Sequence, residues 1–241
     1  MKRHFTGLTD IGVVRSVNQD SYTLDDGEGR FFVVADGMGG HAGGQEASKI
    51  ATKVVKAHLL ENWDSSVDSE TLLKEAIDLA NQSIIEDQQT HPERADMGTT
   101  VVVLIFRDNL SWCAHVGDSR LYRLRGSELK QITEDHTWVG FALKAGEISR
   151  EQAKSHPWRH VLSQCLGRKD LQRIDIQQLD IQSGDRLLIC SDGLTEEVSD
   201  EEIQSFLTQK ATCEEAGTEL IAAAKEAGGS DNITVVIVAQ D

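Results

Sequence analysis

The stretch VVADGMGGHAGG, Val33 to Gly44, sets an apolar, strand-like run against one aspartate and five glycines, with a single histidine among them. Such a turn can let the backbone approach a phosphate, and Gly37, Gly39 and Ala42 fit the G-x-G-x-x-G/A variant of the dinucleotide-binding fingerprint. Alternatively, Asp36 binds a cation at the strand end while the glycines keep bulk away from it. The rest of the chain decides between these two interpretations.

The segments that follow argue against a dinucleotide site. Two consecutive helices, at about 44–62 and 69–88, precede at least three strands, whereas the fingerprint belongs to strict βαβ alternation. Asp36 also places a carboxylate directly before the turn that would have to hold a pyrophosphate. The cation interpretation is therefore favoured.

Apolar or alternating runs predict strands over six segments, and short polar joints at 25–29 and 107–109 are typical of antiparallel hairpins. The expected strands are 30–36, 99–106, 110–116, 120–124, 185–192 and 232–239. Apolar residues recur at helical spacing over 72–84 and 216–227, and Ser149, Ser199 and Thr212 each open a capping-box pattern. The helices are therefore expected outside the strands.

Length and composition restrict the class of protein. The 241 residues are expected to form one domain, and the formal net charge of −16 disfavours partners such as nucleic acid and anionic membranes. Four cysteines without a C-x-x-C motif indicate neither a zinc ribbon nor a disulfide framework. No signal-peptide core or stretch of 18 apolar residues occurs, so a soluble, cytoplasmic chain is expected.

Aspartate recurs at the ends of the expected strands. Asp36, Asp118 and Asp192 each follow an apolar run, and Asp231 opens one. Any one of them is typical of a turn, but four carboxylates brought together would repel one another unless cations lay between them. An oxygen-only ligand set points to Mg²⁺ or Mn²⁺ rather than Zn²⁺, and two such ions about 3.5 to 4 Å apart activate water against phosphate esters. Gly37 could then lend its carbonyl to the cluster.

The segment RSVNQDS places Arg15 five residues before Asp20. In isolation this pair is typical of a solvated surface arginine beside a turn aspartate. A planar guanidinium is nevertheless well suited to hold a phosphate through two parallel hydrogen bonds.

Taken together in their order, these motifs resemble the metal-dependent type 2C (PPM) Ser/Thr protein phosphatases, in the compact form found in bacteria and cyanobacteria. The resemblance runs nearly from end to end, and the ordered set is more specific than any single motif. The motifs are RSVNQD, VVADGMGGHAGGQEAS, MGTTVV, AHVGDSRLYRL, ITEDHT, LLICSDGLTEEV and GGSDNITVVIV.

The resemblance implies an α+β fold, a four-layer αββα sandwich of two antiparallel sheets flanked by helices. It also implies a hydrolase in which a metal-bridging water or hydroxide attacks phosphoserine or phosphothreonine. The implied metal ligands are Asp36 bridging two Mg²⁺ or Mn²⁺ ions, Asp192 and Asp231 on the first ion, Gly37 and, through waters, Asp20 on the second, and Asp118 with Asp192 on a third, weaker ion.

The resemblance further implies that Arg15 binds the substrate phosphate and that His41 is the general acid. Residues 136–167 resemble the flap subdomain beside the active site, which influences substrate choice. His160 stands where many relatives carry asparagine, and is expected to be a surface histidine. His115 lies in an expected strand and is predicted to be a hydrogen-bonded core histidine.

Other functions find less support in the sequence. No cysteine is followed by arginine at C-x₅-R spacing, and the P-loop and protein-kinase motifs are absent. A catalytically inactive, phosphoprotein-binding relative should have lost a metal carboxylate, but Asp36, Asp192 and Asp231 are all present. A monomer acting on phosphorylated Ser/Thr proteins is expected. The resemblance to cyanobacterial members suggests a phosphorylated PII-type signalling protein as substrate.

Overall fold

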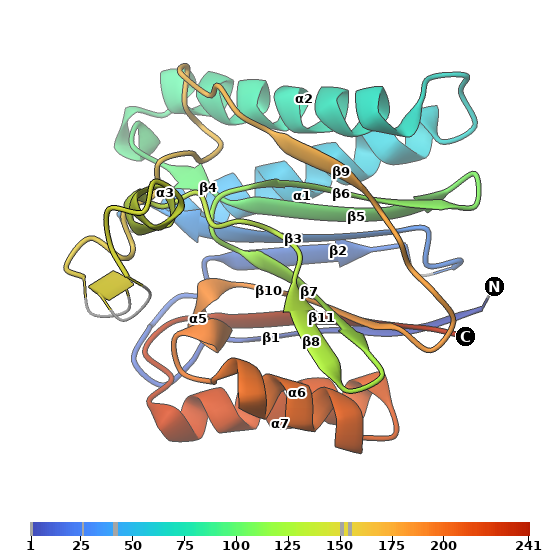
Figure 1. Cartoon of the computed structure of the whole chain (residues 1–241). Coiled ribbons are helices and arrows are strands. Elements are labelled where there is room, and N and C mark those ends of the chain that lie inside the picture. Colours follow the sequence, from blue (N-terminus) through green and yellow to red (C-terminus); the bar gives the residue numbers. More distant parts are fainter. Residues whose placement is uncertain (1, 26, 41–42, 150–151, 154–155) are drawn as a thin grey trace.

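The computed structural model describes the whole chain except residues 1, 26, 41–42, 150–151 and 154–155. Two antiparallel sheets lie face to face. Helices α1 (Gly43–Asn62) and α2 (Ser69–Thr90) cover one outer face, and α6 (Asp200–Gln209) and α7 (Cys213–Ala227) cover the other (Figure 1). The predicted α+β sandwich of four layers is confirmed.

All strand pairings are antiparallel, and each sheet mixes strands from distant parts of the chain. One sheet has the order β1-β11-β10-β7-β8, with bounds Arg3–Asp10, Ile233–Gln240, Arg186–Cys190, Arg120–Arg125 and Glu128–Gln131. The other has the order β2-β3-β5-β6-β9, with bounds Asp20–Leu24, Phe31–Met38, Val101–Arg107, Leu110–Val116 and Asp175–Leu179. The short elements are β4 (Gly98–Thr99), η1 (Pro92–Arg94), α3 (Trp138–Lys144) and α5 (Asp192–Thr195).

The apolar core has three parts because each central strand is buried on both faces. Along β3, Phe31 and Val33 pack with α1 and α2, whereas Phe32 and Val34 pack between the two sheets. A third cluster joins the other sheet to α6 and α7. Complete burial of side chains of this size contributes about 1.5 to 3 kcal/mol each to the stability of the fold. The apolar side chains on the outer faces of the strands therefore hold the helices against the sheets.

Local signals place several of the connections. Asp108 and Asn109 both have positive φ, 54° and 60°, as a two-residue turn between antiparallel strands requires, and they join β5 to β6. Complete capping boxes begin α6 at Ser199 and α7 at Thr212, as predicted. Ser149 also exchanges hydrogen bonds with Gln152, although residues 150–151 lie outside the described part.

The two chain ends lie at one end of the sandwich, and the segments carrying α3 and α5 lie at the other (Figure 1). In the described part of the chain, helices are too short or too polar to span a bilayer.

Candidate metal centre

Five predicted aspartates are placed by the ends of strands. Asp20 opens β2 and stands opposite Asp36 in the β2–β3 register. Asp192 is the first residue of α5, two residues after the end of β10, while Asp118 follows the end of β6 and Asp231 precedes the start of β11. One detail of the prediction was wrong: β3 does not close at Asp36 but continues to Met38, because its last two residues pair with β4.

These carboxylates interact strongly. Burial, followed by repulsion from Asp20, Asp192 and Asp118, raises the pKa of Asp36 well above its usual range. Burial and the charge of Asp192 likewise raise the pKa of Asp118. For Asp192 the pKa is raised first by burial and then by Asp231. The structure therefore brings the five side chains into one electrostatic cluster, in which Asp20, Asp36, Asp118 and Asp192 resist ionisation in the absence of cations.

Asp20 is held by two hydroxyl groups that the sequence did not single out. Ser191 Oγ and Thr234 Oγ1 both donate to Asp20 Oδ2 at 2.7 Å. Burial nonetheless raises the pKa of Asp20 to about 7. Both hydroxyls lie inside the quoted motifs, Ser191 directly before Asp192 and Thr234 three residues after Asp231, but only the assembled sheets reveal their target.

The donor set fits divalent cations. Asp20 is only 8% exposed, and its Oδ1 is buried without a hydrogen-bond partner among the described residues. An unsatisfied buried carboxylate oxygen beside further carboxylates is costly, and a hard cation would satisfy it. Side-chain oxygens without thiolates match the preference of Mg²⁺ and Mn²⁺.

Gly37 lies where the end of β3 meets the start of α1. A Cβ added to Gly37 would stand 1.9 Å from the carbonyl oxygen of Gly44, so no other residue fits without moving backbone. This close approach explains part of the glycine-rich stretch by backbone packing. It also leaves the backbone of residue 37 beside Asp36.

Arg15 lies on an exposed loop, where its Nη2 donates to Asp231 Oδ2 at 2.5 Å. Asn232, which the sequence did not single out, fixes both ends of that loop. Its Nδ2 donates to the carbonyls of Ile11 at 2.9 Å and Val17 at 3.1 Å, and its Oδ1 accepts from the Gln19 amide at 2.8 Å. Arg15 is thereby held beside the carboxylate cluster.

The histidines of the prediction have different outcomes. His41, the expected general acid, lies outside the described residues. His160 is at the surface, as expected, but its Nδ1 lies 2.5 Å from Glu196 Oε1, and both side chains lie near Asp192, with ligand atoms within 4.8 Å of one another. Burial, and after it the charge of Asp192, raises the pKa of Glu196 to about 7.

His115 is buried, and its Nε2 bonds to the Glu134 carbonyl at 2.9 Å, which confirms the predicted core histidine.

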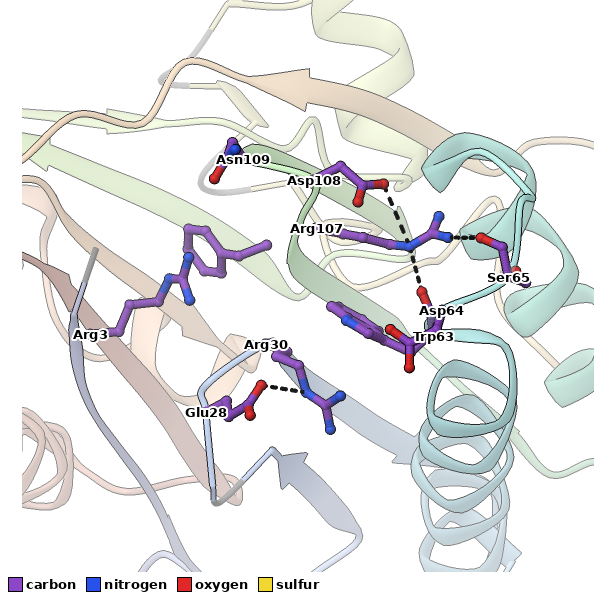
Figure 2. A pocket seen from close by; sticks show the side chains of 10 residues that line it. Arg3, Glu28, Arg30, Trp63, Asp64, Ser65, Arg107, Asp108 and Asn109 are labelled. Carbon is purple, nitrogen blue, oxygen red and sulfur yellow. Dashed lines mark hydrogen bonds and ion pairs between the residues drawn. The ribbon is translucent and has the colours of Figure 1, made fainter.

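Two surface cavities are separate from the carboxylate cluster. One, of about 570 Å³, lies near the start of β3 and contains Arg3, Arg30 and Arg107 (Figure 2). Arg107 donates to three backbone carbonyls and Arg30 pairs with Asp25, so these two guanidiniums serve the fold. A second cavity, of about 830 Å³, lies between α6 and α7. Neither is lined by the predicted site residues.

The chain is similar to proteins of one known family. The sequence profile of the family described as Protein phosphatase 2C matches residues 13–231. The chain is 37% identical to protein phosphatase PhpP of Streptococcus pneumoniae, over 97% of this chain and 96% of that protein.

Solved structures give the same result for the fold. The serine/threonine phosphatase PstP/Ppp of Mycobacterium tuberculosis superposes with a TM-score of 0.90 at 36% identity, covering 100% of both chains. The catalytic domain of PstP in complex with two manganese ions superposes with a TM-score of 0.87 at 34% identity, covering 99% of both chains.

Proposed function

This chain belongs to the protein phosphatase 2C family and is a metal-dependent Ser/Thr protein phosphatase, and we propose that the carboxylate cluster with Arg15 and His41 is its active site. We further propose that residues 1–241 act as a single catalytic domain, with residues 136–167 as a flap beside the site.

In this proposal Asp36 would hold two divalent ions. Asp192 and Asp231 would complete the first ion's protein ligands, and the Gly37 carbonyl and Asp20, through waters, would serve the second. Asp118, together with Asp192, would hold a third, weaker ion. The support is the clustering of these side chains, the raised pKa values of Asp36, Asp118 and Asp192, and the buried Asp20 Oδ1, which has no hydrogen-bond partner among the described residues. When bound, Mg²⁺ or Mn²⁺ activates water and offsets charge on the phosphate ester.

Arg15 is proposed to bind the phosphate group of the substrate. Its side chain is half-exposed, and the bond to Asp231 uses only Nη2 of the guanidinium. A guanidinium can present two parallel N–H groups to a phosphate, which fixes both its position and its orientation. The pairing with Asp231 directs Arg15 toward the carboxylate cluster.

His41 is proposed to protonate the leaving serine or threonine oxygen. The support is its place in the glycine-rich sequence, five residues after Asp36 and two residues before Gly43, the first residue of α1. Imidazole is the side chain whose ordinary pKa best suits general acid catalysis near neutral pH.

The substrates are phosphorylated Ser/Thr proteins, and a PII-type signalling protein is our proposal for one of them. We also propose that the chain acts as a cytoplasmic monomer. The net charge of −16 is consistent with partners that are not nucleic acid.

The main support for the proposed site is the position of Asp36, which is half-buried beside three other carboxylates. Hydrolysis of a phosphoserine peptide should stop in EDTA, return with Mn²⁺ or Mg²⁺, and resist alkylation of the four buried cysteines. Asp192→Asn should reproduce the effect of EDTA, whereas Asp78→Asn, which removes an exposed carboxylate on α2, should not.

Circular dichroism must show that both variants are folded. Full activity after exhaustive chelation, or in folded Asp192→Asn, would contradict the proposed centre.

A further inference from the structure

His136 belongs to the ITEDHT motif and is the first residue of the flap, but the proposed function gives its side chain no role of its own. The residue is 4% exposed and joins three segments that are distant in sequence. Its backbone N–H donates to the carbonyl of Gly117 at 2.9 Å, and its own carbonyl accepts from the Ser163 amide at 2.8 Å. Its side chain contacts Gly117 and Asp175.

The hydrogen bonds determine which ring nitrogen of His136 carries the proton. The Gly117 amide can only donate, and it lies 3.2 Å from Nδ1, so Nδ1 accepts. The proton of the neutral ring is therefore on Nε2, which lies 3.3 Å from Asp175 Oδ2 and donates to it. Arg173 holds Asp175 from the other side through two hydrogen bonds, at 2.5 and 2.6 Å. Burial lowers the pKa of His136, in agreement with a neutral ring.

Gly117 lies in a turn with little freedom to move. Its φ is +107°, and an added Cβ would stand 2.6 Å from two side-chain atoms of Thr100. Ser119 Oγ bonds to Thr100 Oγ1 at 2.7 Å, and the same Thr100 oxygen accepts from the Asp36 amide at 3.0 Å. The turn that carries Asp118 is thus held by Thr100 on one side and by His136 on the other.

We propose that His136 is a positioning residue for Asp118, fixing the Gly117–Ser119 turn by accepting the Gly117 N–H while Asp175 keeps the proton on Nε2. The proposal rests on the ligand role proposed above for Asp118. It also connects the flap to that turn, because the His136 carbonyl holds Ser163.

The alternative role for this cluster is a metal site, since His115, His136 and Asp175 offer ligand atoms within 4.8 Å of one another. Metal binding requires a free imidazole lone pair. The Gly117 amide occupies the lone pair of His136, and Arg173 occupies both oxygens of Asp175. Of the two described imidazoles, only that of His115 offers a free lone pair, on Nδ1, which is buried without a partner among the described residues. The cluster is therefore better suited to hydrogen bonding than to a metal.

Two variants of His136 distinguish the contribution of the acceptor at Nδ1 from that of the donor at Nε2. Asparagine carries an acceptor near the position of Nδ1, whereas glutamine carries a donor near the position of Nε2. By NMR of metal-free, ¹⁵N-labelled protein, the Gly117 amide should exchange with solvent about tenfold faster in His136→Gln than in the wild type. In His136→Asn it should stay close to wild type. The Phe106 amide, which bonds to Arg30 at the other end of the sandwich, reports global opening in each variant.

Mn²⁺ titration by calorimetry gives the second readout. The weakest site should lose about tenfold or more in affinity in His136→Gln and recover in His136→Asn, while the tighter sites stay unchanged. Asp175→Ala should resemble His136→Gln. Asp170→Ala is the matched control, because Asp170 forms the same kind of i, i+2 arginine pair, with Arg168, away from the cluster.

Equal effects of the asparagine and glutamine variants, or wild-type exchange of Gly117 in His136→Gln, would overturn the proposal. Asp118→Asn distinguishes this failure from that of the proposed centre. If Asp118→Asn leaves the weakest Mn²⁺ site unchanged, the ligand role of Asp118 fails, and with it the effect of His136 on metal.

Discussion

Asp20 shows how the surroundings of one side chain favour cation binding at the carboxylate cluster. Two hydroxyl donors on Oδ2 favour the ionised carboxylate, but burial outweighs them and raises its pKa to about 7. Because Asp20 Oδ1 has no hydrogen-bond partner among the described residues, the ionised carboxylate is stabilised fully only when a cation binds to it. We therefore expect metal binding near neutral pH to displace protons from this cluster.

At the same scale, we expect Asn232 to position Arg15 without itself contacting the substrate. Asn232→Ala removes the bonds to the carbonyls of Ile11 and Val17, so the loop should lose its fixed position. We expect KM for a phosphoserine peptide to rise by about tenfold, with a smaller change in kcat, because orientation of the phosphate is lost. Steady-state kinetics at saturating Mn²⁺ measures both parameters.

A double-mutant cycle with Arg15→Ala checks this mechanism. If Asn232 acts through Arg15, the double variant should be no worse than Arg15→Ala, and fully additive losses would argue against the coupling. Asn62→Ala, at the last residue of α1, is the control and should leave KM unchanged.

His41 is tested by the leaving group. A serine alkoxide must be protonated as the P–O bond breaks, whereas para-nitrophenolate departs without help. His41→Ala should therefore slow phosphoserine hydrolysis by about 10² to 10⁴ while affecting para-nitrophenyl phosphate much less. Equal losses on both substrates at saturating metal would show that His41 is not the acid.

At the scale of elements, prediction succeeded where the pattern was local. Strand β6 occupies Leu110–Val116 as predicted, because its residues and the Asp108–Asn109 turn carry their own signals. Strands β1 and β9 were not predicted. They are partly polar segments at the edges of their sheets, and their conformation depends on pairing with β11 and β6.

The flap is an element whose function stays a prediction. The ring of Trp138 stacks on that of His156, with the ring centroids 4.7 Å apart, and meets the ring of Trp158 edge-on at a centroid distance of 5.1 Å. Trp158 is nevertheless 54% exposed. His160, two residues after Trp158, contacts Glu196 near Asp192. This placement suits contact with a protein substrate rather than with the phosphate alone.

Trp158→Ala should accordingly change the ratio of rates on two phosphoproteins more than the rate on a small aryl phosphate. Leu79→Ala removes a similarly exposed apolar side chain from α2 and should change neither. Equal losses on every substrate would assign the flap to catalysis or folding instead.

At the scale of the whole molecule, the site joins residues that the sequence keeps far apart. Asp20 and Thr234 are 214 positions apart and become partners only when the two sheets pack together. Asp36, Asp118, Asp192 and Asp231 could be singled out because each stands near the end of an expected strand, whereas Asp20 was assigned only through the family resemblance. The supporting residues Ser191, Asn232 and His136 could not, since their targets come from other strands and loops.

The pH dependence of stability follows from the same cluster. In the metal-free protein, burial is the largest cause that raises the pKa values of Asp20, Asp36, Asp118 and Asp192. Such carboxyls bind more protons when folded than when unfolded. Their contribution is complete below the unfolded value of about 3.9 and is lost as pH rises through the folded values, which for Asp20 is about 7.

Thermal unfolding in EDTA should therefore show a midpoint that falls between about pH 5 and about pH 8. With excess Mn²⁺ the fall should be absent, because the ions stabilise the ionised cluster in the folded state only. Carboxyls with lowered pKa, such as Asp25 and Asp185, act in the opposite direction but only at lower pH. A midpoint that rises over this interval in EDTA would contradict the electrostatic account.

The most direct test of the central claim is anomalous diffraction at the manganese edge from crystals grown with Mn²⁺. We predict two strong peaks on either side of the Asp36 carboxylate, and a weaker third peak between Asp118 and Asp192. Asp36→Asn crystals should lose at least one of the strong peaks. Peaks only at other surface carboxylates, or no peak beside Asp36 at saturating Mn²⁺, would contradict the account.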